Sequence, residues 1–126
     1  MVVNQFRSKQ KQTGAKYKTF RKKRKSDMGR LPTHTKLGER QAKTLRVLGA
    51  NNKVRLLNSN KVNVYDSKEK KCFVSKIKTV LENPANRHFV RRNVITKGTI
   101  VETEKGKVRI TSRPGQDGTL NGVLIV

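Results

Sequence analysis

The sequence predicts an all-β fold, with a small barrel-like body of short antiparallel strands behind an extended basic N-terminal arm. Of the 19 Val and Ile residues, 17 lie after residue 43, where short apolar runs alternate with turn signals. The first 30 residues instead hold 11 basic residues and one acid, for a charge of +10. We therefore divide the chain into an arm and linker, residues 1–43, and a body, residues 44–126.

The arm has too little patterned apolar surface to form a core. Its apolar residues, such as Phe6 and Phe20, follow no helical or strand period. The segment Lys16–Lys25 has a helix-compatible composition, but like charges on adjacent turns oppose a free helix. We expect the arm to be disordered alone and to order on a polyanionic partner.

The linker joins the arm to the first hairpin of the body. Pro32 restricts the backbone and Gly38 interrupts any helix, so the linker is expected to hold one short helical turn over Glu39–Lys43. A first strand is then expected at Thr44–Leu48, and Gly49–Asn52 is expected to turn the chain back.

Seven more extended segments follow, each bounded by turn residues. Alternation predicts that Val62 and Val64 point inward, as do Val108 and Ile110, while the Pro- and Gly-containing segment Ser112–Gly118 is expected to be a loop. The segments are expected at Lys53–Leu57, Lys61–Tyr65, Cys72–Leu81, His88–Ile95, Thr99–Thr103, Lys107–Thr111 and Thr119–Val126.

The segment Cys72–Leu81 is the longest predicted strand. Strict alternation places Phe73, Ser75, Ile77, Thr79 and Leu81 on one face, opposite the lysines of this segment. Cys72 lies inside a strand and is expected to be a small core residue rather than a nucleophile.

The net charge points to a polyanionic partner. The 126 residues carry 31 Lys and Arg against 8 Asp and Glu, a net charge of +23 that repels itself in a compact state. Nucleic acid is the leading candidate and an acidic membrane surface the second. There is no apolar run long enough for a membrane-spanning helix, and polar residues beginning at Asn4 predict no signal peptide.

The residue types do not predict an enzyme. The sequence lacks the glycine patterns of phosphate and dinucleotide loops, and its eight acidic residues are scattered. His34 and Cys72 form no recognisable nucleophile pair, and one Cys with two His falls short of a four-ligand zinc site. We expect no cofactor, no metal and no small-molecule substrate.

The strongest local motif is the run Arg21–Lys25, five consecutive cations. Such a run matches closely spaced phosphates, and its binding releases condensed counterions. Arg can hold a phosphate with two parallel hydrogen bonds, whereas Lys acts as a mobile point charge. The alternatives for this run are a solvated basic tail or a nuclear import signal.

Two weaker clusters lie in the body. In Arg87–Arg92, Phe89 is expected to anchor a strand while Arg91 or Arg92 reaches outward, and the alternative is a solvated basic strand face. Arg46, Lys53 and Arg55 surround the turn at Gly49–Asn52, whose backbone N–H groups could face a phosphate if it adopts positive φ. The alternative there is an ordinary hairpin turn. Arg113 beside Pro114-Gly115 is likewise a candidate phosphate contact, with an ordinary turn as the alternative.

Several multi-residue motifs occur in order along the chain: Thr13-Gly14, Arg21–Lys25, Gly29-Arg30, Pro32-Thr33, Gly38, Arg46-Val47, Gly49, Asn51, Lys53, Arg55, Asn83–His88, Val90–Asn93, Ile95–Gly98 and Ser112–Gly118. With these motifs the whole chain resembles the S-eight-e family of archaeal and eukaryotic small-subunit ribosomal proteins. The short length is similar to the archaeal form. The chain departs from the family pattern where Gly14 precedes Ala15, where Ser26-Asp27 replaces a Tyr-Glu pair, and where Leu48–Asn51 lacks one cation.

The resemblance implies a β-barrel-like body with a basic arm, and a structural role in the cytoplasmic small ribosomal subunit. The implied partners are small-subunit ribosomal RNA and neighbouring ribosomal proteins, with no membrane. A ribosome assembly factor and a DNA-compacting chromatin protein are the alternative functions. The expected RNA-binding residues are Lys16, Arg21, Lys22, Lys23, Arg24, Lys25, Arg30, Lys36, Arg46, Asn51, Lys53, Arg55, Arg87, Arg91, Arg92 and Arg113.

Overall fold

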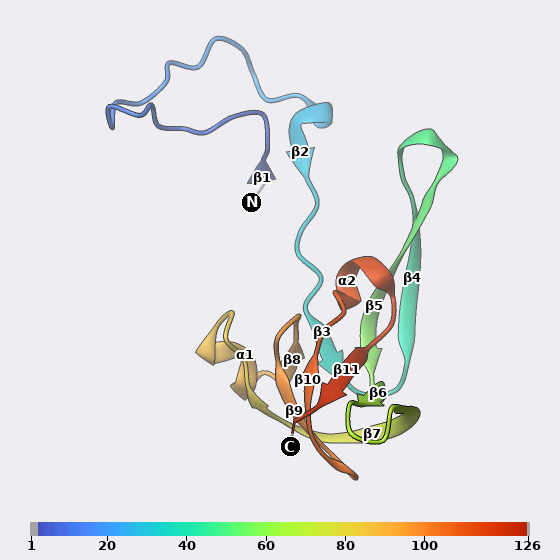
Figure 1. Cartoon of the computed structure of the whole chain (residues 1–126). Coiled ribbons are helices and arrows are strands. Elements are labelled where there is room, and N and C mark those ends of the chain that lie inside the picture. Colours follow the sequence, from blue (N-terminus) through green and yellow to red (C-terminus); the bar gives the residue numbers. More distant parts are fainter. Residues whose placement is uncertain (1–2, 126) are drawn as a thin grey trace. The chain divides into compact units, whose positions relative to one another are not determined.

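A computed structural model describes residues 3–125 and divides the chain into two compact units, Met1–Pro32 and Thr33–Val126. The second unit is built mainly from strands and contains a closed barrel, which confirms the predicted all-β body (Figure 1). Its boundary after Pro32 differs from the expected boundary after residue 43. Between residues 3 and 125, no helix is long or apolar enough to cross a membrane.

Five strands of the second unit close into the barrel in the order β10-β11-β6-β7-β9, and β9 pairs with β10 to complete the circle. All neighbours run antiparallel except β11 and β6, which run parallel. The expectation of antiparallel strands is therefore wrong at this position. The barrel strands are β6 (Lys61–Asp66), β7 (Lys71–Glu82), β9 (Ile100–Thr103), β10 (Gly106–Ile110) and β11 (Asn121–Leu124).

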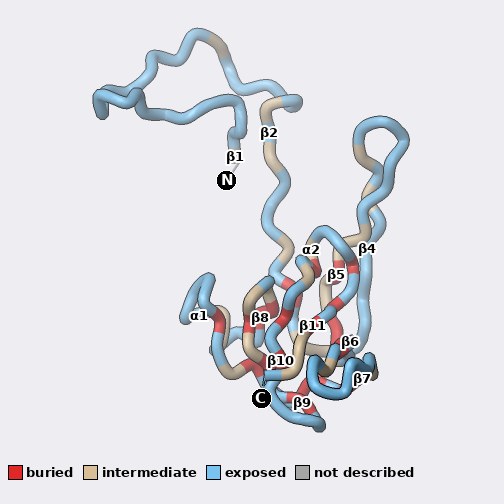
Figure 2. Tube along the Cα trace, viewed as in Figure 1, coloured by how far each residue is buried: buried red, intermediate tan, exposed pale blue. Residues whose placement is uncertain are grey.

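Alternating apolar residues fill the barrel (Figure 2). Val62 and Val64 are 1% exposed, and Val108 and Ile110 are equally buried, as their spacing predicts. Removing such a side chain from water contributes about 1.5–3 kcal/mol to stability. The buried apolar cluster comprises Leu56, Val62, Val64, Ile77, Val80, Ile95, Val101, Val108, Ile110 and Leu120.

Strand β7 departs from the predicted alternation halfway along its length. Ile77 pairs with Thr103 and Thr79 with Glu102, so β7 carries one extra residue at this point, a β-bulge. Beyond the bulge the inward position moves by one residue, and Val80 is buried while Thr79 is exposed. At the other end of β7, Cys72 is exposed, so the prediction that it is a core residue is wrong because it lies on the outer face.

A four-stranded sheet with the order β4-β5-β3-β8 extends the body. The helical turn expected over Glu39–Lys43 is wrong, because β4 begins at Gln41 and pairs antiparallel with β5. Pairing with a partner strand overrides the weak local helix preference. β3, within the predicted linker, pairs parallel with β5. The strands are β3 (Thr35–Leu37), β4 (Gln41–Arg46), β5 (Asn52–Ser59) and β8 (Val94–Ile95), and the 3-10 turn η2 (Leu48–Ala50) joins β4 to β5.

Two short helices replace segments expected to be extended or looped. α1 (Arg87–Arg91) lies where a strand over His88–Ile95 was expected, and the Asn86 side chain caps it by accepting a hydrogen bond from the His88 N–H at 2.9 Å. α2 (Pro114–Asp117) lies within the expected loop, with Pro at its first turn and Gly118 in the left-handed region at its end.

The first unit contains little regular structure. β1 (Val3–Asn4) pairs antiparallel with β2 (Met28–Gly29), and η1 (Lys25–Asp27) directly precedes β2. Between them, Gln10 and Lys16 form an isolated bridge around a turn in which Gly14 has a φ of 83°. The arm therefore forms a closed loop between its two ends.

Candidate nucleic-acid interface

The basic run of the arm contains one cation that is bonded internally and four that are exposed. The Arg21 guanidinium donates from Nη1 to Asp27 Oδ2 at 2.8 Å and from Nη2 to Oδ1 at 3.2 Å. This pair lowers the pKa of the Asp27 carboxyl. The side chains from Lys22 to Lys25 are exposed. The run thus presents four cations rather than five for phosphate binding.

An aromatic cluster in the arm was not foreseen from the sequence. The Arg7 guanidinium lies 4.2 Å from the Tyr17 ring centroid, and the Arg21 guanidinium lies 4.7 Å from that of Phe6. The rings of Phe6 and Phe20 are 5.8 Å apart. Arginine against an exposed ring contributes about 0.5–1 kcal/mol. Three of the six aromatic residues fall within the first 20 positions. This concentration of rings is the sequence feature that indicates an aromatic cluster in the arm.

Two further arm cations, Lys16 and Arg30, were predicted to bind RNA. Lys16 is exposed beside the turn that follows Lys11, where the Lys11 N–H donates to the Ala15 carbonyl at 2.7 Å. Arg30 is also exposed, directly after β2. Both predicted residues are therefore on the surface of the first unit.

In the body, the β4–β5 hairpin projects beyond the rest of the sheet (Figure 1). Lys43 lies directly opposite Arg55, and Lys53 lies opposite Leu45, so these residues share one face of the hairpin. Lys43 was not among the predicted residues, although the cross-strand register makes it a neighbour of Arg55. Arg46 pairs with Asn52 and belongs to the opposite face. The hairpin thus carries cations on both faces.

The tip of the hairpin is held by its own polar groups. The Asn51 side chain donates to the Leu48 carbonyl at 3.2 Å, and the Val47 N–H donates to the Asn51 carbonyl at 2.8 Å. Positive φ is found at Gly49 (70°), as expected, and at Ala50 (59°), whereas Asn51, where it was also expected, has a φ of −73°. Asn51, a predicted RNA contact, therefore shapes the turn with its side chain. Leu48 is 95% exposed at the tip.

Helix α2 packs against the middle of the hairpin, on strand β5. A Cβ atom on Gly118 would come within 2.6 Å of the Val54 Cβ, so helix and strand are in close contact. Lys53 Nζ donates to Gln116 Oε1 at 3.0 Å, and this bond fixes the lysine near α2. Arg113 is exposed at the N-terminus of α2. The fold therefore brings Arg113 to the hairpin, which its position in the sequence alone did not indicate.

The other predicted body residues lie elsewhere on the surface. Arg87 and Arg91 are exposed on α1, four residues apart on one helix face, and Arg92 is exposed at its C-cap. The half-buried Phe89 ring lies 5.2 Å from the His34 ring and anchors the helix, not the strand that was expected. Lys36 is exposed on β3.

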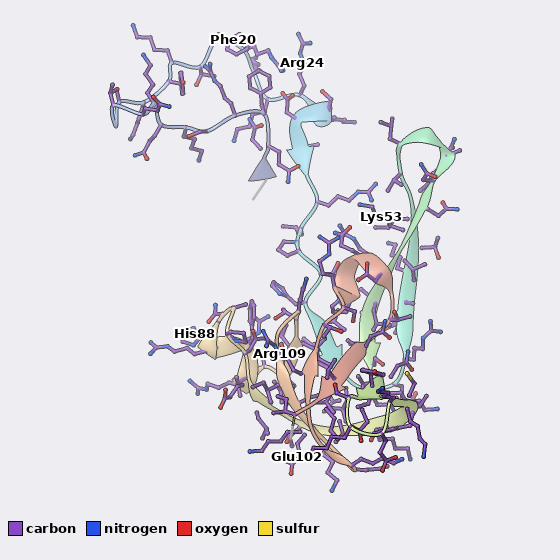
Figure 3. The ribbon with its side chains drawn as sticks, viewed as in Figure 1. Phe20, Arg24, Lys53, His88, Glu102 and Arg109 are labelled. Atoms are coloured by element: carbon purple, nitrogen blue, oxygen red, sulfur yellow. The ribbon has the colours of Figure 1, made fainter. Side chains whose placement is uncertain are left out.

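Most acidic residues of the body lie on the barrel, beside nine of its cations. Figure 3 shows Lys53 and Glu102 at opposite ends, with His88 on a third side. Five of the seven acidic residues after Pro32 lie on the barrel strands or their turns, away from the hairpin. These five are Asp66, Glu69, Glu82, Glu102 and Glu104.

The fold and these clusters define a class of protein: a small basic β-barrel protein with exposed cations on an arm, on a projecting hairpin, on a short helix and on the barrel strands. Such a surface suits a polyanion. The chain belongs to the family Ribosomal protein S8e, whose model matches residues 4–125. This confirms the resemblance seen in the sequence, and the family is one of ribosomal proteins rather than enzymes.

Three archaeal relatives, each named small ribosomal subunit protein eS8, match most of the chain. The protein of Nanoarchaeum equitans is 57% identical over 113 residues, which cover 90% of this chain and 89% of the relative. The Methanococcoides burtonii protein is 50% identical over 96% of this chain and 97% of its own length. The Methanococcus aeolicus protein is 48% identical over 99% of this chain and 98% of its own length.

Proposed function

We propose that the chain is a structural component of the cytoplasmic small ribosomal subunit and binds small-subunit ribosomal RNA. Membership of the Ribosomal protein S8e family is the observation that carries this proposal. The relatives' printed names assign them to the small ribosomal subunit. The partners are ribosomal RNA and neighbouring ribosomal proteins.

In this proposal the arm carries most of the electrostatic affinity and orders on RNA during assembly. Support comes from the four exposed cations of Lys22–Lys25 and from the net charge of +10 over residues 1–30. The contacts go mainly to phosphate and sugar, so selectivity comes from the shape of the RNA. Arg21 acts chiefly within the arm, because its guanidinium already binds Asp27.

The body contributes a second set of phosphate contacts from the hairpin and α2. Lys53, Arg55 and Arg113 lie in this part of the fold, and Lys43 joins them through the cross-strand register. Five acidic residues of the barrel lie away from the hairpin. A ribosomal RNA helix can thus approach the hairpin without meeting those carboxylates. Arg87, Arg91 and Arg92 supply a separate contact from α1.

The test compares two quadruple alanine variants that remove the same charge. One replaces Lys22–Lys25; the control replaces Lys68, Lys71, Lys76 and Lys78, which are exposed on the barrel. Affinity for small-subunit RNA is measured at several salt concentrations. The arm variant is expected to lower the salt slope by about 3, since each phosphate contact contributes roughly 0.7–0.9. Equal slopes for both variants would contradict the assignment of affinity to the arm.

A further inference from the structure

We propose that the outer face of β7, β6 and β11 is a docking surface for a neighbouring protein of the small subunit rather than for RNA. This inference rests on the proposed ribosomal function. We call the surface the neutral strip, and it comprises Asn63, Tyr65, Cys72, Val74, Asn121 and Val123.

The strand register places these six residues in a grid of two rows. In one row Tyr65 lies between Cys72 and Val123, and in the other Asn63 lies between Val74 and Asn121. All six point outward, because the alternate positions, such as Val62 and Val64, are buried in the barrel. The neighbouring strands are about 4.8 Å apart, so the grid is continuous.

The neutral strip is uncharged, and all of its residues are exposed except Val123, which is half-buried. Val74 is 62% exposed and Tyr65 is 41% exposed, and the Cys72 thiol is also exposed. In the second row the Asn63 side chain donates to Asn121 Oδ1 at 2.9 Å. The two amides thus satisfy part of each other's hydrogen bonding, which lowers the cost of taking this row out of water.

The absence of charge from these six positions argues against phosphate as the ligand. The chain carries a net charge of +23, and its binding to RNA depends on cations reaching phosphates. The neutral strip offers none. Tyrosine with aliphatic side chains, and few charges, is instead typical of the centre of a protein–protein interface.

The charged residues around the neutral strip indicate which kind of partner segment would bind there. Lys61 and Lys76 are paired at one end, and Arg109 pairs with Val123 at the side. A partner segment with an apolar centre and carboxylates at its rim would fit this arrangement. A second copy of this chain fits poorly, because two molecules each carrying +23 repel one another.

The single cysteine of the chain provides a direct test, because Cys72 lies within the neutral strip. We expect N-ethylmaleimide to modify Cys72 rapidly in the free full-length protein. In assembled small subunits the rate is expected to fall at least about tenfold. An equal rate in both states would overturn the proposal, because the strip would then be uncovered.

A crosslink identifies what covers the strip. In a Cys72→Ser, Ser67→Cys double variant, a photoreactive maleimide at position 67 lies in the exposed turn after β6, beside the strip, and the rim lysines are kept. Irradiated subunits are expected to yield adducts that survive ribonuclease and contain another ribosomal protein. Adducts to RNA alone, or to a second copy of this chain, would overturn the proposal.

Two substitutions with the same change in charge separate docking from general repulsion. Val74→Glu places a carboxylate within the strip, and Ser67→Glu places one in the exposed turn after β6. Val74→Glu is expected to dissociate from subunits about tenfold faster than Ser67→Glu, with equal thermal stability of the free proteins. Equal dissociation rates would overturn the proposal. If the unmodified chain never enters the subunit, the proposed ribosomal function fails, and this inference fails with it.

Discussion

Single residues decide which cations of this chain can reach a partner. The Arg21 guanidinium holds Asp27 with two hydrogen bonds, whereas the exposed cations of Lys22–Lys25 face solvent. The five consecutive cations therefore differ in role: Arg21 forms an ion pair within the arm, and the other four are exposed to solvent. Asp27 selects between them, because it is the single acid among residues 1–30.

The Asp27 carboxyl is expected to titrate below its usual pKa of about 3.9. The hydrogen bond from Arg21 favours the charged carboxylate and lowers this pKa. Because the pKa is lowered, the contribution of the ion pair is fully present above about pH 4 and is lost as the pH falls through the lowered value. Carbon-detected NMR titration measures the pKa. An Arg21→Ala variant should move it toward the usual value, and an unchanged pKa would contradict the pairing.

Ser75 is expected to tolerate the loss of its hydroxyl. Within residues 3–125, its buried Oγ has no hydrogen-bond partner, which is unfavourable for stability. Ser75→Ala should therefore change the free energy of unfolding by less than about 1 kcal/mol. The control is Val64→Ala, also inside the barrel, which should lower it by about 2 kcal/mol. Urea denaturation measures the free energy of unfolding of both variants. A loss above about 1 kcal/mol for Ser75→Ala would show that the Ser75 hydroxyl does form a hydrogen bond.

Among the elements, the contact between α2 and β5 determines the position of the hairpin. Gly118 ends α2 with a φ of 71° and lies directly against Val54. Lys53 joins the same contact through Gln116. The orientation of the hairpin cations therefore depends on a helix of four residues near the C-terminus.

Gly118→Ala is expected to destabilise the body by about 2–4 kcal/mol. Alanine is strained at positive φ, and its Cβ would also clash with Val54. Gly49→Ala is the matched control, because Gly49 has a φ of 70° but lies at the open tip, where the added Cβ meets a flexible Asn51 side chain at 3.4 Å. Gly49→Ala should cost only about 1 kcal/mol. Thermal unfolding measures the stability of both variants. Equal losses of stability would show that the contact between Gly118 and Val54 contributes little.

The sequence predicted elements well where alternation is strict and poorly where one residue interrupts it. Val62, Val64, Val108 and Ile110 have a period of two, and the fold buries them accordingly. The bulge before Thr79 reverses the faces of β7, and no local pattern marks it. Asn86 before α1 was a recognisable helix cap, yet the apolar residues after it favoured a strand.

For the candidate site, the sequence was sufficient to predict which residues are involved, but not which of them lie next to one another in the fold. The basic clusters were evident from charge density alone. The pairing of Lys43 with Arg55 depends on strand register, and the approach of Arg113 to the hairpin depends on α2 packing. Both are long-range consequences of the fold, so they could not be derived from spacing along the chain.

At the scale of the whole molecule, the chain separates a stable body from a charged arm. Among residues 3–125, the buried apolar cluster runs from Leu56 to Leu120 and includes none of those in the arm. The arm, by contrast, carries +10 of the net +23 in 30 residues. Stability and electrostatic reach thus come from different parts of the sequence.

Deleting residues 1–32 is therefore expected to leave the thermal midpoint of the body within about 3 °C of that of the full chain. The reason is that the core cluster stays complete. Affinity for small-subunit RNA at moderate salt should fall by at least about 100-fold, since the deletion removes eleven cations. Differential scanning calorimetry and filter binding measure the two properties. A large drop in the midpoint would show that the arm is part of the core.

The parallel pairing of β11 with β6 also has a consequence for synthesis of the chain. β11 follows the other four barrel strands in the described sequence, and because it lies between β10 and β6 it is the strand that closes the barrel. Until residues 121–124 have left the ribosome that is synthesising them, β6 and β10 each have an open edge. Open edges invite pairing with other chains. The barrel therefore cannot close until residues 121–124 are available for pairing, and a chain that lacks them would be exposed to aggregation.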